Sequence, residues 1–222
     1  MDIDDKFHQI NKLIESHRNG DASAAMARMG LVYGANYGVS IPELKQIAQK
    51  FAGDHELALK LFSEDVRECK ILASLIDNPV QVTDEQMDSW SQSFINHEIV
   101  EQVCGNLFWK SEYALSRSLE WCLSNDEMLQ KAGMIIAARR AADPSVKDDV
   151  FEPYIEMVLN FDEDQMSIAR NSAAFTLRQI ALRNETFRSR VVTLAQSMAQ
   201  SEDENRAWVG GQLLFELEEV EE

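Results

Sequence analysis

The sequence predicts an all-α protein built as a stack of helix pairs. Residue types that favour helices, such as Ala, Leu, Glu, Gln and Met, are abundant. The 222 residues include only 4 Pro and 9 Gly, which is too few for many tight β-turns. Hydrophobic residues make up 45% of the chain, which fits a folded protein with a sizeable core rather than a disordered one.

The stretch 166–183 has the pattern of a buried helix. One apolar row at helical spacing consists of Ala169, Ala173, Leu177 and Ile180, and a second row beside it of Ile168, Ser172, Phe175 and Gln179. Small residues in this stripe let a neighbouring helix come close. We interpret the stretch as the inner helix of a repeat, packed on one side and open to solvent on the other.

Similar segments recur along the chain. They begin near Leu61, Leu123, Phe161 and Ser201, and each combines an acidic turn with a helix that has a basic residue near its start. The last three recur at roughly the ~40-residue period of HEAT-type helix pairs. Such pairs stack into a right-handed, curved α-solenoid whose inner helices line a concave face. Chance similarity among amphipathic helices is the alternative.

The element boundaries follow from the apolar periodicity and from cap residues. We expect one HEAT-like domain over 1–222, in which the last few acidic residues form a frayed tail. Ser40 is an expected N-cap, and Pro42 falls within the first turn of its helix. Helices are expected at 3–18, 22–33, 41–52, 54–62, 65–77, 84–95, 98–108, 111–123, 126–142, 146–159, 164–183, 185–200 and 203–219.

Charge and cysteine content limit the partners and the compartment. The net charge of −17 argues against non-specific binding to nucleic acid or anionic membranes. Residues 131–190 are nevertheless neutral overall, which leaves two readings open: a local basic surface, or ordinary solvated helix faces. The three cysteines have no CxxC spacing, and no run approaches the ~20 apolar residues of a membrane span. We therefore expect free thiols, no membrane partner and a cytoplasmic protein.

Metal and cofactor chemistry is not indicated. The four histidines lack metal-ligand spacing with carboxylates or cysteines. There is no P-loop and no GxGxxG motif. We expect neither a metal nor a cofactor.

Four stretches, taken in order and spacing, resemble the DNA alkylation repair family of HEAT-like DNA glycosylases. They are Tyr37-Gly-Val-Ser-Ile-Pro-Glu-Leu-Lys45, Asn96-His-Glu-Ile-Val-Glu101, Leu129-Gln-Lys-Ala132 and Ala173-Ala-Phe-Thr-Leu-Arg178. The resemblance spans roughly residues 25–200, and the Gly-Val-Ser-Ile-Pro element is its most specific part. It implies excision of alkylated purines from duplex DNA held on a positively charged concave face, without metal or cofactor.

The resemblance also implies site residues. His97 stands at the position of the family's first Trp, and Glu101 at that of its Asp four residues later. Lys131 stands at the basic position, Phe175 at the second Trp, and Arg178 at the arginine of the Leu-Arg pair. Glu101 would be catalytic, because a carboxylate can stabilise the cationic sugar that develops as the glycosidic bond breaks. The other four would bind DNA.

The first four of these residues differ from the family's usual types, so a second interpretation stays open. Glu101 would then be a surface carboxylate, His97 an ordinary first-turn helix residue, and Phe175 a core or groove aromatic. The corresponding function is a non-catalytic HEAT-like scaffold that binds a protein or a nucleic acid. The sequence alone is compatible with both an enzyme and a non-catalytic scaffold.

Overall fold

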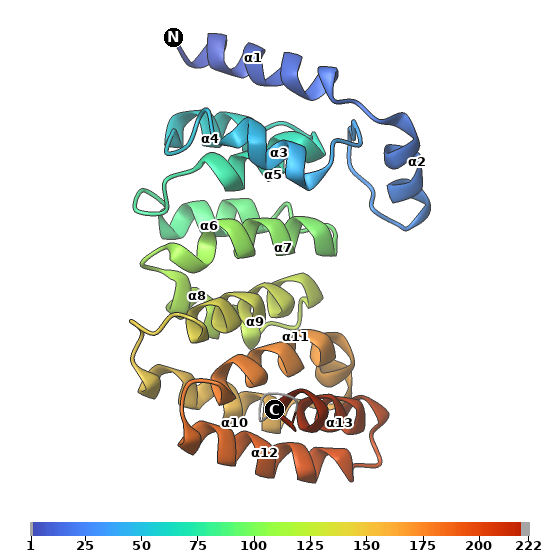
Figure 1. Cartoon of the computed structure of the whole chain (residues 1–222), viewed down its shortest axis with the longest axis vertical. Helices are drawn as coiled ribbons and strands as arrows, with labels where there is room; N and C mark the ends of the chain where they lie inside the picture. The colour runs from blue at the N-terminus through green and yellow to red at the C-terminus, as the bar shows by residue number, and fades with distance from the viewer. Residues whose placement is uncertain (1, 219–222) are drawn as a thin grey trace. The chain divides into compact units, whose positions relative to one another are not determined.

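The structure is a computed structural model that describes residues 2–218. Within this range the chain is all-α, as predicted, with thirteen α-helices and two short 3-10 segments (Figure 1). The chain forms two compact units, Met1–Tyr113 and Ala114–Glu222. A single domain over 1–222 stays a prediction. Of the acidic run at the end, residues 216–218 are helical and 219–222 lie outside the described residues.

The helices of the first unit are α1 Ile3–Ser16, α2 Gly20–Arg28, α3 Ile41–Ala48, α4 His55–Phe62, α5 Arg67–Ile76, α6 Asp84–Ser91 and α7 His97–Asn106, followed by the 3-10 segment η1 Phe108–Lys110. Those of the second are α8 Ala114–Cys122, α9 Glu127–Ala141, the 3-10 segment η2 Asp148–Phe151, α10 Glu152–Asn160, α11 Glu163–Ala181, α12 Glu185–Ala199 and α13 Glu204–Glu218. The thirteen expected helices therefore correspond one to one with the observed ones.

Helix α5 is the centre of the first unit. Nine of its ten residues are buried, and α3, α4 and α7 pack around it. Beside it, the rings of Phe62 and Trp90 stack with centroids 3.8 Å apart, and Phe108 lies against Trp90. By contrast, α2 has no buried residue.

In the second unit α11 lies between α9 and α13. The Thr176 hydroxyl donates to the Met134 carbonyl of α9 at 2.8 Å, and Arg170 donates to the Asn205 side chain of α13 at 3.3 Å. Arg183, which follows α11, donates to the carbonyl of Ala141 at the end of α9. Arg178 and Glu216 form a second contact further along α11 and α13. Because the partners advance together along each pair of helices, α9, α11 and α13 run in the same direction.

Local cap chemistry explains most helix starts. Ser40 caps α3 in a capping box with Glu43, and Asp54 and Thr83 cap α4 and α6. At α9 the cap is Asp126 rather than the neighbouring Asn125. No helix in residues 2–218 is long and apolar enough to cross a membrane.

Two adjacent glycines of α13 allow a direct test of the packing. A Cβ on Gly210 would lie 2.3 Å from the Ala199 backbone nitrogen, whereas one on Gly211 meets nothing within 4 Å. We expect Gly210→Ala to lower the free energy of unfolding by about 1–3 kcal/mol, because α12 and α13 must separate. Gly211→Ala should raise it by roughly 0.5–1 kcal/mol through helix propensity. Urea denaturation of both variants measures this, and equal effects would contradict the close approach.

Candidate nucleic-acid interface

The five sequence-predicted site residues divide between the two units. His97 and Glu101 belong to α7 of the first unit. Lys131 is on α9, and Phe175 and Arg178 are on α11 of the second.

His97 and Glu101 share the exposed side of α7. They are four residues apart, so their side chains are neighbours one helical turn apart. Asn96 caps this helix by accepting from the Ile99 backbone N–H at 3.1 Å. Glu98, between the two exposed residues, turns inward instead. The start of α7 thus presents an imidazole and a carboxylate to solvent from a fixed turn.

A buried polar network fixes that turn. We call it the Arg67 network, and it consists of Tyr33, Arg67, Glu68 and Glu98. The guanidinium of Arg67 donates to both carboxylate oxygens of Glu98, at 2.8 and 2.6 Å, and to Glu68 at 3.0 Å. Tyr33 donates to Glu98 at 2.7 Å. This bidentate arrangement of Arg with a carboxylate is among the stronger charge-assisted contacts.

The same network holds the Gly-Val-Ser-Ile-Pro loop. Glu68 accepts from the backbone N–H groups of Tyr37 and Val39, at 3.1 and 3.2 Å. Arg67 donates to the Val39 carbonyl at 2.9 Å. The most specific sequence motif is therefore a structural element that connects the loop before α3 to α5 and α7.

The network shifts the ionisation of its members. Burial by itself would raise the pKa of Glu98, but the contacts with Arg67 outweigh it and hold that pKa below its ordinary value. Burial, together with the hydrogen bond to Glu98, raises the pKa of Tyr33 well above its ordinary value. Arg67 and Glu98 therefore form a charged pair at neutral pH, while Tyr33 is a neutral donor.

In the second unit, cationic and apolar side chains gather on the solvent side of three neighbouring helices. We call this surface the α9–α11–α13 face. Its residues are Lys131, Ile135 and Arg139 of α9, Arg170, Asn171, Phe175 and Arg178 of α11, and Trp208 and Phe215 of α13. Phe175, near the middle, is 44% exposed, so the aromatic predicted from the sequence lies on the surface and not in the core.

Many other cations of this unit are used to hold the fold. Arg183 binds the carbonyls of Ala141 and Asp143 and pairs with Asp148. Arg190 pairs with Glu152, and Arg206 donates to the main-chain carbonyls of Leu159 and Phe161 at the end of α10. Among the described residues, Arg139 and Arg170 make no ion pair with a carboxylate. Both arginines lie on the α9–α11–α13 face.

Arg178 is already paired. Its Nε lies 3.1 Å from Oε2 of Glu216 on α13, and Gln212 donates to the same carboxylate at 2.5 Å. Both side chains of the ion pair are about 30% exposed (28% and 30%). A phosphate that approached Arg178 would have to compete with Glu216.

Trp208 is the aromatic that sequence reasoning missed. The apolar neighbours of Trp208 in the sequence predict a core residue. Trp90 and Trp121 have similar neighbours and are indeed buried. Trp208 is instead 39% exposed, and the guanidinium of Arg170 lies 5.3 Å from its ring centroid. The spacing of Asn205, Trp208 and Gln212, which places them on one side of α13, was the available signal.

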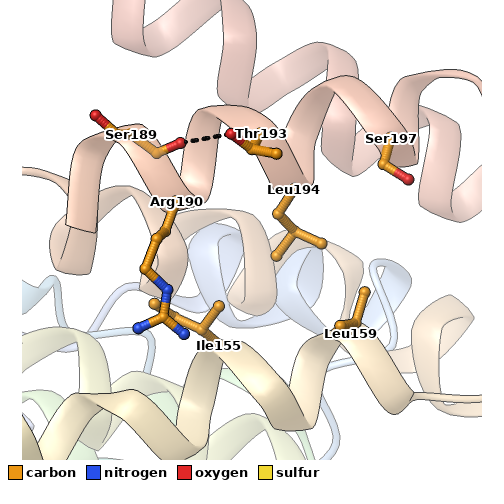
Figure 2. Close-up of a pocket in the computed structure, with 7 residues that line it drawn as sticks. All are labelled: Ile155, Leu159, Ser189, Arg190, Thr193, Leu194 and Ser197. Atoms are coloured by element: carbon orange, nitrogen blue, oxygen red, sulfur yellow. Dashed lines mark hydrogen bonds between the residues drawn. The ribbon is translucent and has the colours of Figure 1, made fainter. Parts of the chain in front are cut away.

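A separate groove lies between α10 and α12. Figure 2 shows Arg190 and Leu194 of α12 pointing toward Ile155 and Leu159 of α10. These side chains line a cavity of about 480 Å³. The lining is mostly apolar and contains no carboxylate or histidine. It offers no acid–base or metal chemistry, and among the described residues no cluster of three or more metal-ligating side chains occurs elsewhere.

Comparison with known proteins agrees with the resemblance. A family model described as DNA alkylation repair enzyme matches residues 10–201. The chain belongs to this family. One solved structure is described as a new family of proteins related to the HEAT-like repeat DNA glycosylases with affinity for branched DNA structures. It has a TM-score of 0.77 and 18% identity, and the match covers 96% of this chain and 94% of that one.

The match to that structure confirms the predicted HEAT-like repeat fold for this DNA alkylation repair family member. A comparison with curated proteins gave no match. The family is therefore established by the model match, while the roles of His97, Glu101, Lys131, Phe175 and Arg178 stay predictions.

Proposed function

We propose that this protein binds DNA through the α9–α11–α13 face, and that binding rather than base excision is its principal activity. The observation that carries the proposal is the combination of Lys131, Arg139 and Arg170 with the exposed ring of Phe175 on adjacent helices. Lys and Arg side chains supply the phosphate contacts that dominate DNA affinity. An exposed aromatic ring supplies stacking on a base or sugar.

The acidic residues nearby are arranged around this centre. Glu127, Glu163 and Glu204 lie in the first turns of α9, α11 and α13, where a carboxylate favours the helix dipole. Because the three helices run in the same direction, these carboxylates form one rim of the face and leave its middle to the cations. A strand of DNA would cross the middle, and the rim would limit how far it can shift along the helices.

The neighbour with affinity for branched DNA supports the choice of DNA as partner, and so does family membership. We expect the protein to prefer DNA whose helix is interrupted, by a branch or by an abasic site, over an intact duplex. An interrupted helix exposes bases and sugars to Phe175, whereas an intact one offers mainly phosphates.

Binding should therefore depend on salt and on charge at this face. We expect Lys131→Glu and Arg139→Glu each to weaken binding to a duplex with an abasic-site analogue by more than about tenfold at low salt. Each should also reduce the salt slope by about one unit. Fluorescence anisotropy at low and moderate salt measures both quantities.

The matched control is Lys147→Glu, which makes the same charge change at an exposed residue before η2, away from the face. It should weaken binding much less. Equal losses in all three variants would mean that only net charge matters. Absence of binding by the unaltered protein at low salt would overturn the proposal and favour a scaffold that binds a protein.

Base excision is the second candidate, favoured by the exposed pair His97 and Glu101 on α7. If Glu101 stabilises the developing sugar cation, the protein releases methylated purines from methylated DNA and Glu101→Gln abolishes the release. Glu101→Gln should leave DNA binding by the second unit intact, which separates chemistry from binding. No release by the unaltered protein would exclude this candidate for the bases assayed.

A further inference from the structure

The α9–α11–α13 face carries a second aromatic position, outside the residues that the family resemblance points to. Trp208 is 39% exposed on α13, and Arg170 of α11 lies over its ring, 5.3 Å from the centroid. Arg170 is itself steadied by a hydrogen bond of 3.3 Å to Asn205. The two side chains come from different helices, so tertiary packing brings them together.

The space beside Trp208 is left open by Gly211. Gly211 lies three residues after Trp208 and therefore on the same side of α13. A Cβ on Gly211 would meet nothing within 4 Å, so packing does not require glycine there. Glycine in a helix interior costs roughly 1 kcal/mol relative to alanine. The space that its absent side chain leaves open lies on the same side of α13 as Trp208.

We propose that Trp208, Arg170 and Gly211 form a stacking site for one unpaired nucleotide of DNA. The base stacks on the indole and guanidinium planes, in the space that Gly211 leaves, and the adjoining phosphate lies near the charge of Arg170. Aromatic and arginine planes are the usual platforms for unstacked bases. This inference rests on the proposed DNA-binding function and names the feature of DNA that the face selects.

Charge explains why the site lies at Trp208 and not at Phe215. Phe215 is even more exposed, at 58%, and lies seven residues further along the same side of α13. It is close in sequence to Glu216 and Glu218, which repel phosphate, and Arg178 is paired with Glu216. At Trp208 the adjacent cation Arg170 makes no ion pair with a described carboxylate, although Glu204 lies one turn away. Phe215 is therefore a matched internal control.

The experiment compares two fluorescent DNAs of the same sequence, a blunt duplex and the same duplex with a short single-stranded gap, by anisotropy with the full chain. We expect the unaltered protein to bind the gapped DNA about tenfold more tightly. Trp208→Ala should remove this preference, because its loss falls mainly on the gapped DNA. Trp208→Phe should retain most of it, and Phe215→Ala should retain all of it.

Gly211→Leu supplies a variant whose effect cannot come from misfolding. Leucine is a good helix former with open space around it here, so the thermal midpoint should not fall. Filling the space should nevertheless remove the preference for gapped DNA.

The outcomes separate this inference from the function on which it rests. If gapped and blunt DNA bind equally, or if Trp208→Ala weakens both alike, the stacking site is wrong while DNA binding stands. If neither DNA binds to the unaltered protein at low salt, both proposals fall.

Discussion

Replacing Arg67 by methionine should lower the free energy of unfolding by about 3–5 kcal/mol, the range for removing one partner of a buried ion pair. The Arg67 side chain is 1% exposed, and its removal leaves the carboxylates of Glu68 and Glu98 without their cationic partner. Glu68 is fully buried and would keep only its two backbone donors. Methionine fills a similar volume, so the loss reports the charges and not a large cavity.

Urea denaturation at neutral pH measures the effect, with Arg28→Met as the control. Arg28 is an exposed residue of α2, and its replacement should change stability by less than about 0.5 kcal/mol. Glu98 makes the same prediction testable by pH. Because its pKa is lowered in the folded state, its contribution is present above the ordinary carboxyl pKa and is lost as the pH falls through the folded value. Stability in Arg67→Met that matched the wild type would contradict a structural role for the network.

Alkaline pH should destabilise the protein steeply, beginning near pH 9. Burial raises the pKa of Cys69 to about 12 and those of Cys104 and Cys122 further. A group whose folded pKa is raised contributes stability below its unfolded pKa and loses it as the pH rises toward the folded value. Above pH 9 the unfolded chain therefore releases three thiol protons that the folded chain retains. Burial lowers the pKa of Lys70, so the folded chain loses this one proton before the unfolded chain does, which partly offsets the loss of stability.

Each retained proton changes stability by about 1.4 kcal/mol per pH unit, so two to three net protons give roughly 3–4 kcal/mol per unit. Tyr33 and Tyr154, whose pKa values burial also raises, add to the loss above about pH 10. Urea denaturation between pH 8.5 and 10.5, with reductant present, measures the slope. Cys104→Ala should reduce this slope by the contribution of about one proton, roughly 1.4 kcal/mol per pH unit. A stability that stays constant over this range would show that the thiols are not buried as described.

The fold followed from the sequence because helix patterning is local. Amphipathic spacing located all thirteen helices, and Ser40 was identified as a cap because a suitable side chain directly precedes its helix. At α9 the sequence does not single out one cap, because Asn125 and Asp126 are both suitable residues and backbone geometry decides between them. Arg67 and Glu68 look like solvated surface charges in the sequence. Their burial depends on Glu98 and Val39, about 30 residues away along the chain.

The candidate interface could be predicted only where it follows helical spacing. The four-residue separation of His97 and Glu101 was enough to place them on one side of α7. The pairing of Arg178 with Glu216, 38 residues later, depends on how α13 packs on α11. The exposure of Trp208 has the same origin, since Arg170 meets it only across the two helices.

The pair of Arg178 and Glu216 changes how salt titrations of DNA binding should be read. Salt weakens DNA binding because each phosphate contact returns condensed counterions to the solution. When Arg178 exchanges Glu216 for a phosphate, a carboxylate of the protein is set free, and it recruits a cation from the solution in its turn. That contact therefore returns fewer ions than one made by Arg139 or Arg170. The slope of affinity against salt would undercount the phosphates that the proposed interface contacts.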